Sequence, residues 1–240
     1  MKRIGIIAAL KREVKYLIKD MEEVRSVGKG VVSSNPIYEW TVNGREIIVV
    51  ISGVGKKGSE RAIRLLIDSY NPELIIITGY AGSLTPDLVV GDVVVYSRAL
   101  SESGEHVDFI KPEPLFSTRF GNDGTVLTVD KFIGSVDGKR EIGERLGAPI
   151  VDMESLYIGR IAAEKGLPCI GIRVISDDLV MEIPNLSGLL NREGEAEIVR
   201  AIRFFMSHPG TVVPLFFFLY NMRRATLILD GYIRENLHLL

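Results

Sequence analysis

Short runs rich in β-branched residues alternate with segments of helical period, and this alternation constrains the fold more than any other feature of the chain. "RIGII" (3–7) precedes "KREVKYLIKDM" (11–21), and "REIIVVIS" (45–52) precedes "SERAIRLLIDSY" (59–70). Such a pattern is typical of a parallel sheet flanked by helices. We therefore expect strands and helices to follow one another in the first third of the chain.

The middle of the chain departs from simple strand–helix–strand units, because its apolar runs have too little helical pattern between them. The later elements that the pattern predicts are strands at 73–78, 87–100, 125–129 and 168–176 and helices at 140–146 and 155–166. The sequence thus predicts an α/β fold, a three-layer α/β/α sandwich with a central mixed sheet.

Length and apolar content favour one compact domain. The chain has 240 residues, 46% of them hydrophobic, and no Pro/Ser-rich linker or internal repeat divides it. A chain of this length can bury a large core. We expect residues 1–240 to form a single domain with an apolar helical C-terminal extension over about 185–240. Residues 101–124, in which Gly and Pro interrupt every period, are expected to form a long loop that borders a pocket.

The ionisable residues limit the partners. Lys and Arg total 29 against 31 Asp and Glu, so there is no basic field for a phosphate backbone and nucleic acid is not an expected partner. The histidines His106, His208 and His238 are too scattered for a metal site, and the single cysteine, Cys169, forms no intrachain disulfide. We expect no metal ion.

Two apolar runs bear on location. "IGIIAAL" is shorter than the core of a signal peptide. "TVVPLFFFLY" is about half the length needed to cross a bilayer. The expected location is the cytoplasm.

The glycines of "GVGKKG" (Gly53, Gly55, Gly58) match G-x-G-x-x-G between a strand and a helix. A dinucleotide site would also need an acid near the end of the next strand, where this chain has Thr78 and Tyr80. A tight strand-to-helix turn needs glycines whatever it binds. A small-ligand or phosphate contact at the turn remains an alternative.

Three acids follow predicted strands: Glu13 after "IGIIAA", Glu154 after "PIVDM" and Asp177 after "IGIRVIS". Ligands of such folds bind beyond the carboxyl ends of the strands, so the acids could share one crevice. Alternatively, Glu13 and Glu154 favour the first turns of helices, where an acid contributes ~0.3–1 kcal/mol, and Asp177 caps a turn. Spacing alone leaves both interpretations open.

Six motifs in order resemble the nucleoside phosphorylase superfamily, especially its methylthioadenosine/S-adenosylhomocysteine nucleosidase branch. They are "IGIIAALKREV", "SGVGKKG", "TGYAGSLTPDLVVGDVVV", "DKFIGS", "VDMES" and "RVISDD". The resemblance implies a three-layer α/β/α domain, usually a homodimer or higher homo-oligomer. It also implies cleavage of the N-glycosidic bond of a nucleoside without a cofactor.

The resemblance assigns roles to single residues. Glu13 matches the acid that activates the attacking water, and Asp177 the acid that protonates or hydrogen-bonds the purine N7. Glu154 matches the acceptor of the ribose hydroxyls, with Met153 against the sugar. Phe132 matches the residue that stacks on the base. The remaining substrate contacts are assigned to Ile133, Gly79, Tyr80, Ser176 and Arg173.

Some of these residues have simpler interpretations. Phe132 and Met153 could be ordinary core residues. Arg173 could orient Glu154 or Glu13, or only compensate a buried acid.

The attacking nucleophile, water or phosphate, is less constrained. Where related phosphorylases carry an arginine and a serine for phosphate, this chain has Ile77 and Tyr80. Arg12, however, lies where phosphorylases can carry a phosphate-binding arginine, and Gly53 and Gly55 could add backbone contacts. We expect hydrolysis, with phosphorolysis and phosphate as a co-substrate as the alternative.

The C-terminal tail "FFMSHPGTVVPLFFFLYNMRRATLILDGYIRENL" and the segment "SVDGKREIGERLGAPIVDMES" resemble the hopanoid-biosynthesis-associated branch of the superfamily. That resemblance implies adenosylhopane as substrate, with the apolar tail lining an exit for the 5′ group. The alternatives are a core or subunit-contact helix, or a helix that lies on the inner membrane surface.

Two other functional classes remain. A catalytically silent nucleoside-binding protein would keep Phe132 and Glu154 without needing both Glu13 and Asp177. A dehydrogenase would use "GVGKKG" to bind NAD. All four nucleosidase residues are present, which favours an enzyme.

Overall fold

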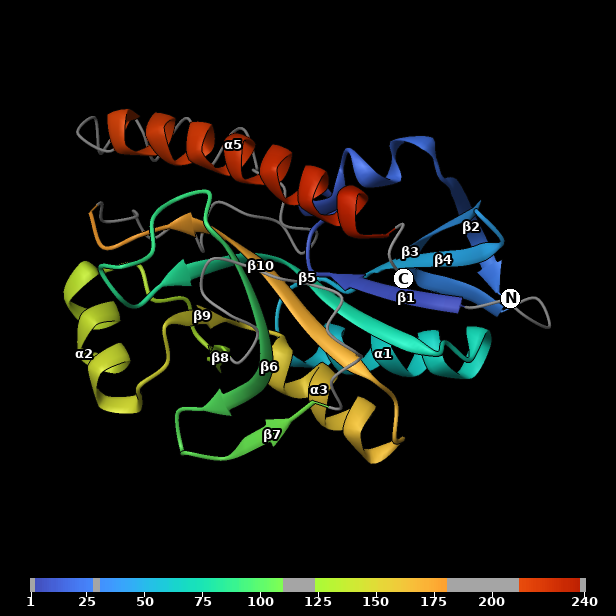
Figure 1. The fold of residues 1–240 in the computed structure, drawn as a ribbon, viewed down its shortest axis with the longest axis horizontal. Helices are drawn as coiled ribbons and strands as arrows, with labels where there is room; N and C mark the ends of the chain where they lie inside the picture. The colour runs from blue at the N-terminus through green and yellow to red at the C-terminus, as the bar shows by residue number, and fades with distance from the viewer. Residues whose placement is uncertain (1–2, 28–30, 110–123, 181–211, 238–240) are drawn as a thin grey trace.

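The computed structural model describes residues 3–27, 31–109, 124–180 and 212–237 (Figure 1). The elements in chain order are β1 (Arg3–Ala8), η1 (Lys11–Val14), η2 (Leu17–Asp20), β2 (Glu22–Val27), β3 (Val31–Val42), β4 (Arg45–Ile51), α1 (Lys56–Tyr70), β5 (Leu74–Ser83), β6 (Val93–Ser101), β7 (His106–Asp108), β8 (Gly124–Thr128), α2 (Val136–Leu146), β9 (Ile150–Asp152), α3 (Ser155–Glu164), β10 (Cys169–Asp177) and α5 (Val212–Leu237).

Within the described residues the strands form one mixed sheet in the order β10-β6-β8-β9-β5-β1-β4-β3-β2, with β7 on β6. β1 runs parallel to β4 and β5, and β5 runs parallel to β10. β10 is antiparallel to β6, and β9 is antiparallel to β5. Because β10 pairs with both β5 and β6, the strands β5, β10, β6, β8 and β9 form a closed ring of paired strands.

Helices cover both faces of the sheet. α1 and α3 pack on one face, and α5 crosses the other (Figure 1). The alternation within β1 explains why: Ile7 belongs to a core shared with Leu66 of α1, whereas Ile6 belongs to a core shared with Leu229 of α5. A strand buried on both faces is a continuous apolar run, as "RIGII" is. The three-layer α/β/α fold is as predicted.

The segment 11–21 is not the helix that its period suggests, since it forms the two short 3-10 turns η1 and η2. Two carbonyl groups of this segment accept hydrogen bonds from a distant residue, since the Arg234 guanidinium donates to the carbonyls of Tyr16 and Leu17. Tertiary contact with α5 therefore overrides local propensity here.

The structure extends or divides other predicted elements. β5 continues past the predicted end at 78 to Ser83. The predicted loop 101–124 contains β7, which pairs with β6, while residues 110–123 lie outside the described part of the chain.

The C-terminal helix α5 spans Val212–Leu237, within the predicted extension, whose residues 185–211 lie outside the described part. Its buried apolar residues recur every three or four positions, at Met222, Ala225, Leu229, Ile233 and Leu237, as on one face of a helix. Among the helices that the structure describes, none combines the length and hydrophobicity needed to span a membrane.

Candidate active site

Three predicted acids lie at one edge of the sheet. β1, β5 and β10 are parallel, so their carboxyl ends meet there. Glu13 follows β1, Asp177 ends β10, and Glu154 joins β9 to α3. Their exposed fractions are 3%, 8% and 5%. Carboxylates this deeply buried require partners.

Glu13 is oriented by two backbone N–H groups. Its Oε2 accepts a hydrogen bond from Leu10 N at 2.9 Å, and its Oε1 accepts one from Tyr80 N at 3.1 Å. Burial raises the pKa of Glu13, while the charge of Arg173 and these backbone donors oppose the rise. A carboxylate with a raised pKa is a better general base, which suits the activation of water.

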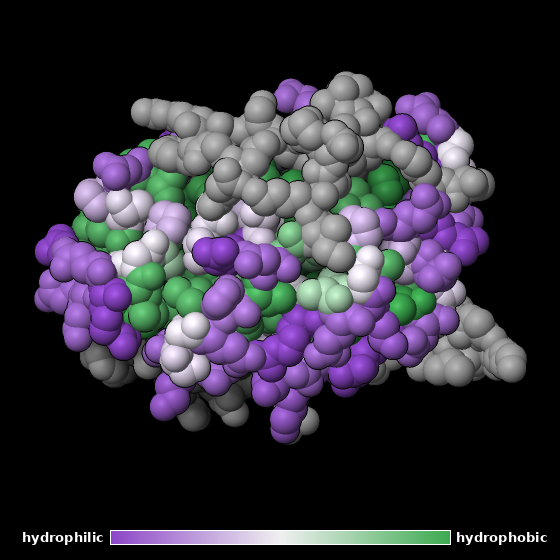
Figure 2. Space-filling model, turned by 60° about the horizontal axis from the view of Figure 1, so that its bottom comes forward, coloured by the Kyte–Doolittle hydropathy of each residue, from purple (hydrophilic) through white to green (hydrophobic). Residues whose placement is uncertain are grey.

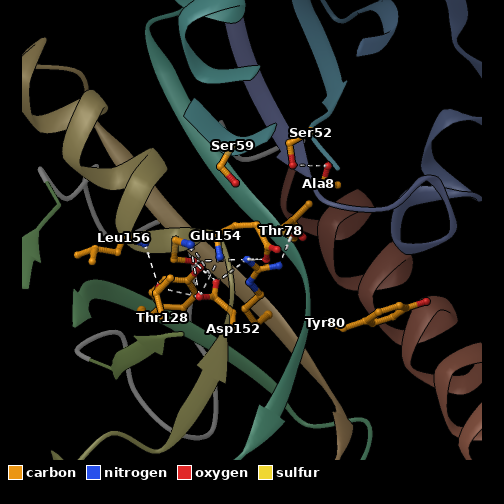
Figure 3. A network of polar contacts seen from close by, with 12 residues as sticks. Ala8, Ser52, Ser59, Thr78, Tyr80, Thr128, Asp152, Glu154 and Leu156 are labelled. Carbon is orange, nitrogen blue, oxygen red and sulfur yellow. Dashed lines mark hydrogen bonds and ion pairs between the residues drawn. The ribbon is translucent and has the colours of Figure 1, made fainter. Parts of the chain in front are cut away.

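Arg173 is the centre of a buried polar network with Asp152 and Glu154. Figure 3 shows Asp152, Glu154 and Thr128 close together in this network. Its side chain is 1% exposed, and Nη2 lies 2.5 Å from Asp152 Oδ2 and 3.3 Å from Glu154 Oε2. Nη1 donates to the carbonyl of Thr78 at 3.1 Å. Arg173 therefore both compensates buried acids and fixes the position of Glu154, so the two interpretations of this residue are compatible.

Glu154 is also held by the glycine turn, whose Gly55 N donates to Oε1 at 3.0 Å. Burial raises the pKa of Glu154 to about 7 against the opposing charge of Arg173, and the neighbouring Asp152 and Glu13 add to the rise. The carboxylate is thus fixed from two sides beside Glu13.

The turn itself has the expected backbone. Gly53 and Gly55 have φ values of 76° and 83°, and a Cβ at Gly58 would lie 2.3 Å from the Ser52 carbonyl oxygen. Because a carboxylate already occupies the Gly55 N–H, the turn presents an acid where a dinucleotide would need to place its pyrophosphate. This arrangement disfavours the dinucleotide interpretation.

Gly79 lets Glu13 and Arg173 approach the same point of β5. It has a φ of 137°, and a Cβ there would lie 2.6 Å from Arg173 Nη1 and 2.7 Å from Glu13 Oε1. Any side chain at this position would displace the predicted base or its neighbour.

Asp177 lies further along β10 and has its own partners. Its Oδ1 accepts a hydrogen bond from Ser176 Oγ at 2.7 Å, and its Oδ2 forms an ion pair with Lys139 of α2. The side chain of Lys139 is 1% exposed. The predicted leaving-group acid is therefore paired with a buried cation that the sequence reasoning missed.

The predicted base and sugar contacts differ in exposure. Phe132 is 50% exposed, so the core interpretation is wrong for this residue and an open aromatic face is available for stacking. Met153 and Ile133 are partly buried and pack against the same apolar cluster, near Leu127 and Val151.

Tyr80 and Arg12 face α5. The Tyr80 side chain points away from the buried acids (Figure 3), and its hydroxyl lies 2.5 Å from Thr226 Oγ1. The Arg12 carbonyl is 3.5 Å from the same Thr226 hydroxyl. α5 is thus hydrogen-bonded, through Thr226, both to the turn that carries Glu13 and to Tyr80, whose N–H binds Glu13. Ile77, at one of the compared phosphate positions, is 0% exposed.

Sequence reasoning missed Asp152 and Lys139 as parts of the site. Asp152 was visible as an acid within an apolar run, and it binds Arg173, the Thr128 hydroxyl and the Ser155 N–H. Lys139 gave no signal, because it lies in the polar segment "SVDGKREIGE", where a solvent-exposed lysine is the ordinary expectation.

Taken together, these side chains suit displacement at a sugar carbon. Glu13 is a buried carboxylate fixed by two backbone N–H groups, Glu154 is a second carboxylate held by Arg173 and Gly55, and Asp177 is a third, paired with Lys139. Carboxylates also favour positive charge that develops on a sugar ring.

Comparison with known proteins finds relatives that are named as nucleosidases. A methylthioadenosine/S-adenosylhomocysteine nucleosidase of Listeria welshimeri is 30% identical over 202 residues, covering 72% of this chain and 85% of that protein. The Staphylococcus epidermidis nucleosidase of the same name is 27% identical over 198 residues, with 72% and 86% covered.

Solved structures share the fold. A Helicobacter pylori methylthioadenosine/S-adenosylhomocysteine nucleosidase in complex with a substituted pyrrolidin-3-ol superposes with a TM-score of 0.71 at 18% identity, covering 100% of this chain and 99% of that one. Futalosine hydrolase of Helicobacter pylori also gives 0.71, at 19% identity, with 100% and 98% covered.

The family profile described as the phosphorylase superfamily matches residues 3–122 and 119–186. These matches span every element that carries a predicted site residue. The chain belongs to the phosphorylase superfamily.

Proposed function

We propose that this chain is a nucleosidase that uses water to cleave the N-glycosidic bond of an adenine nucleoside. The observation that carries the proposal is Glu13, a buried carboxylate fixed by the N–H groups of Leu10 and Tyr80 beside the Arg173 network. The names of the relatives, nucleosidases and a futalosine hydrolase, support cleavage of this bond.

Each acid has a separate part in the mechanism. Glu13 accepts a proton from the attacking water, Glu154 accepts hydrogen bonds from the ribose hydroxyls, and Asp177 serves the purine N7. A proton at N7 improves the leaving group, and the two carboxylates near the sugar stabilise an oxocarbenium-like transition state. Phe132 offers its open face to the base.

Water is favoured over phosphate because the cluster around Arg173 is rich in carboxylates. Gly55, a candidate phosphate contact, donates its N–H to Glu154, and Arg173 is committed to Asp152 and Glu154. Among the described residues of this cluster, a phosphate dianion would face the carboxylates of Glu13 and Glu154, and the guanidinium of Arg173 already binds two acids. Arg12, which is half-buried, is the residue that favours the phosphorolytic alternative.

The experiment is product analysis. The protein is incubated with adenosine, methylthioadenosine and an adenosyl lipid, with and without phosphate, and the products are separated. Free adenine and the free sugar, formed at a rate independent of phosphate, support hydrolysis. A sugar 1-phosphate that requires phosphate would establish phosphorolysis instead. Glu13→Gln is the matched variant, since the amide keeps the shape without the base.

For the 5′ group we propose a bulky apolar substituent, as in adenosylhopane. α5 is bonded to Tyr80 through Thr226, which brings this helix next to the residue that orients Glu13. The same helix carries apolar side chains that are half exposed, namely Phe217, Leu219, Tyr220 and Leu227. Burying such surface against a lipid contributes roughly 25 cal/mol per Å².

This substrate is tested by comparing kcat/KM for an adenosyl lipid and methylthioadenosine in the parent, Phe217→Ser and Leu227→Ser. Loss of lipid preference in the variants supports a substrate role for α5. Dissociation of a homo-oligomer, followed by light scattering, would assign the helix to a subunit interface. If the variants keep the preference for the lipid substrate but bind anionic vesicles more weakly than the parent, α5 would be assigned to a membrane surface, which the exposed Arg223 and Arg224 would also contact.

We also propose that residues 1–240 form a single domain and that the protein is located in the cytoplasm. α5 supports it, because its buried face completes the core on one side of the sheet.

A further inference from the structure

Lys139 is a fully buried cation whose place in the proposed reaction no sequence motif explains. It lies in α2, and its Nζ contacts Asp177 Oδ2 and lies 3.5 Å from the Asp178 carbonyl. The side chains of Lys139 and Asp177 are 1% and 9% exposed. A buried charge without a partner is unfavourable, so each of these groups depends on the other.

The hydrogen bonds around Asp177 describe a carboxylate, which can only accept. Oδ2 faces the ammonium of Lys139, and Oδ1 accepts from Ser176 Oγ at 2.7 Å. A Cβ at Gly82 would lie 2.9 Å from Oδ2, so β5 also approaches this oxygen closely. A carboxylate in this state has no proton to give to N7.

We propose that Lys139 is a positioning residue for the leaving-group acid, holding Asp177 in place and supplying through it the proton that the departing purine takes up. This inference rests on the proposed function. The inference extends the proposed function by naming the source of the proton within the protein, the ammonium group of Lys139, which contacts the carboxylate of Asp177 directly.

The proton transfers balance. An Nζ–H bond of Lys139 breaks as an O–H bond forms on Asp177, and a carboxyl proton of Asp177 moves to N7. The C1′–N9 bonding pair passes into the purine, and the water oxygen bonds to C1′ while Glu13 takes its proton. Loss of one proton from Glu13 to solvent and gain of one by Lys139 restore the starting state.

The test uses two leaving groups. A purine needs a proton to depart, whereas p-nitrophenolate leaves p-nitrophenyl β-D-ribofuranoside as a stable anion. We compare the parent, Lys139→Met and Asp177→Asn on this riboside and on adenosine or methylthioadenosine, whichever the parent cleaves faster. Arg140→Met is the matched control, because it removes an exposed cation from the same helix.

The expected result is a ~10²- to 10⁴-fold fall in kcat for the purine nucleoside in Lys139→Met, the range of general acid catalysis. KM and the p-nitrophenyl reaction should stay within a few-fold of the parent. Equal losses on both substrates would indicate a structural role and overturn the proposal. Purine turnover like that of the parent would overturn it as well.

The double variant Lys139→Met/Asp177→Asn guards against misfolding, since it leaves no unpaired buried charge. If Lys139 acts through Asp177, the double variant should match Asp177→Asn in kcat. A further loss of tenfold or more would contradict the proposal. If the parent does not cleave purine nucleosides, the proposed function itself is refuted. If the parent cleaves them and Lys139→Met does so equally well, only the role of Lys139 is refuted.

Discussion

Replacing Gly79 by alanine should disable the site with limited loss of stability. The new Cβ would lie 2.7 Å from Glu13 Oε1 and 2.6 Å from Arg173 Nη1, where ordinary contact begins at 3.4 Å. The Glu13 carboxylate or the β5 backbone must therefore shift by about 0.7 Å (3.4 − 2.7). Misplacement of a reacting group by ~1 Å can cost ~10²-fold in rate, so we expect kcat to fall roughly 10- to 100-fold.

The same substitution strains the backbone, because Gly79 has a φ of 137°. Such strain costs ~1–3 kcal/mol. Gly104→Ala separates the two effects: Gly104 also has a positive φ, 87°, but nothing lies within 4 Å of its added Cβ.

The assays are steady-state cleavage of the preferred nucleoside and chemical denaturation. Both variants should lose similar stability, and Gly79→Ala alone should lose kcat. Equal activity in the two variants would refute the placement of Glu13 against Gly79.

Three further predictions concern the buried acids. The unfolding free energy should decrease as pH rises from about 4.5 to about 7, because the pKa of Glu154 is raised from 4.5 to about 7 in the folded state, which then holds the extra proton. Denaturant titrations of the parent and Glu154→Gln at pH 5 and 8 check this. The same decrease of unfolding free energy with pH in the parent and in the variant would contradict it. Arg173→Met should lower stability by ~3–5 kcal/mol by leaving Asp152 unpaired, whereas a loss below ~1 kcal/mol would show that the network relaxes. A 2′-deoxynucleoside should lose much of kcat/KM, since charge-assisted hydrogen bonds to Glu154 contribute ~1.5–3 kcal/mol each; equal values for ribo and deoxyribo substrates would remove Glu154 from this role.

Much of the sheet could be predicted because its strands are buried on both faces. β1 is a nearly continuous apolar run, and β10 is a buried run that only Arg173 interrupts before Ser176 and Asp177. The rule that ligands lie beyond the carboxyl ends of parallel strands placed Glu13 and Asp177 at the same edge, where the structure has them. The helix predicted over 11–21 is wrong, and two carbonyls of this segment, those of Tyr16 and Leu17, accept hydrogen bonds from Arg234, more than 200 residues later in the chain. Local period carries no information about a partner so distant in sequence.

The partners of the acids were harder to predict than the acids themselves. A carboxylate that follows an apolar run is unusual enough to notice, as Glu13, Glu154 and Asp177 were. Lys139 lies among polar residues on a helix, and only the fold shows that its side chain turns inward toward Asp177, 38 residues away. A buried ion pair of this kind depends on which helix face meets the strand end, and the polar pattern of α2 leaves that face unspecified.

Figure 2 shows one face of the molecule, on which apolar residues gather in a band across the middle and polar residues along the lower edge.

The glycine turn shows why a motif alone does not locate a site. "GVGKKG" predicted the backbone correctly: a strand, a turn with positive φ at Gly53 and Gly55, and a helix. The same turn can present its N–H groups to a pyrophosphate, but here Gly55 donates to Glu154, 99 residues later in the chain. A carboxylate at that donor repels the anion that the motif suggests and leaves the turn to orient an acid. The motif therefore determines a backbone shape, and a residue outside it determines what that shape can bind.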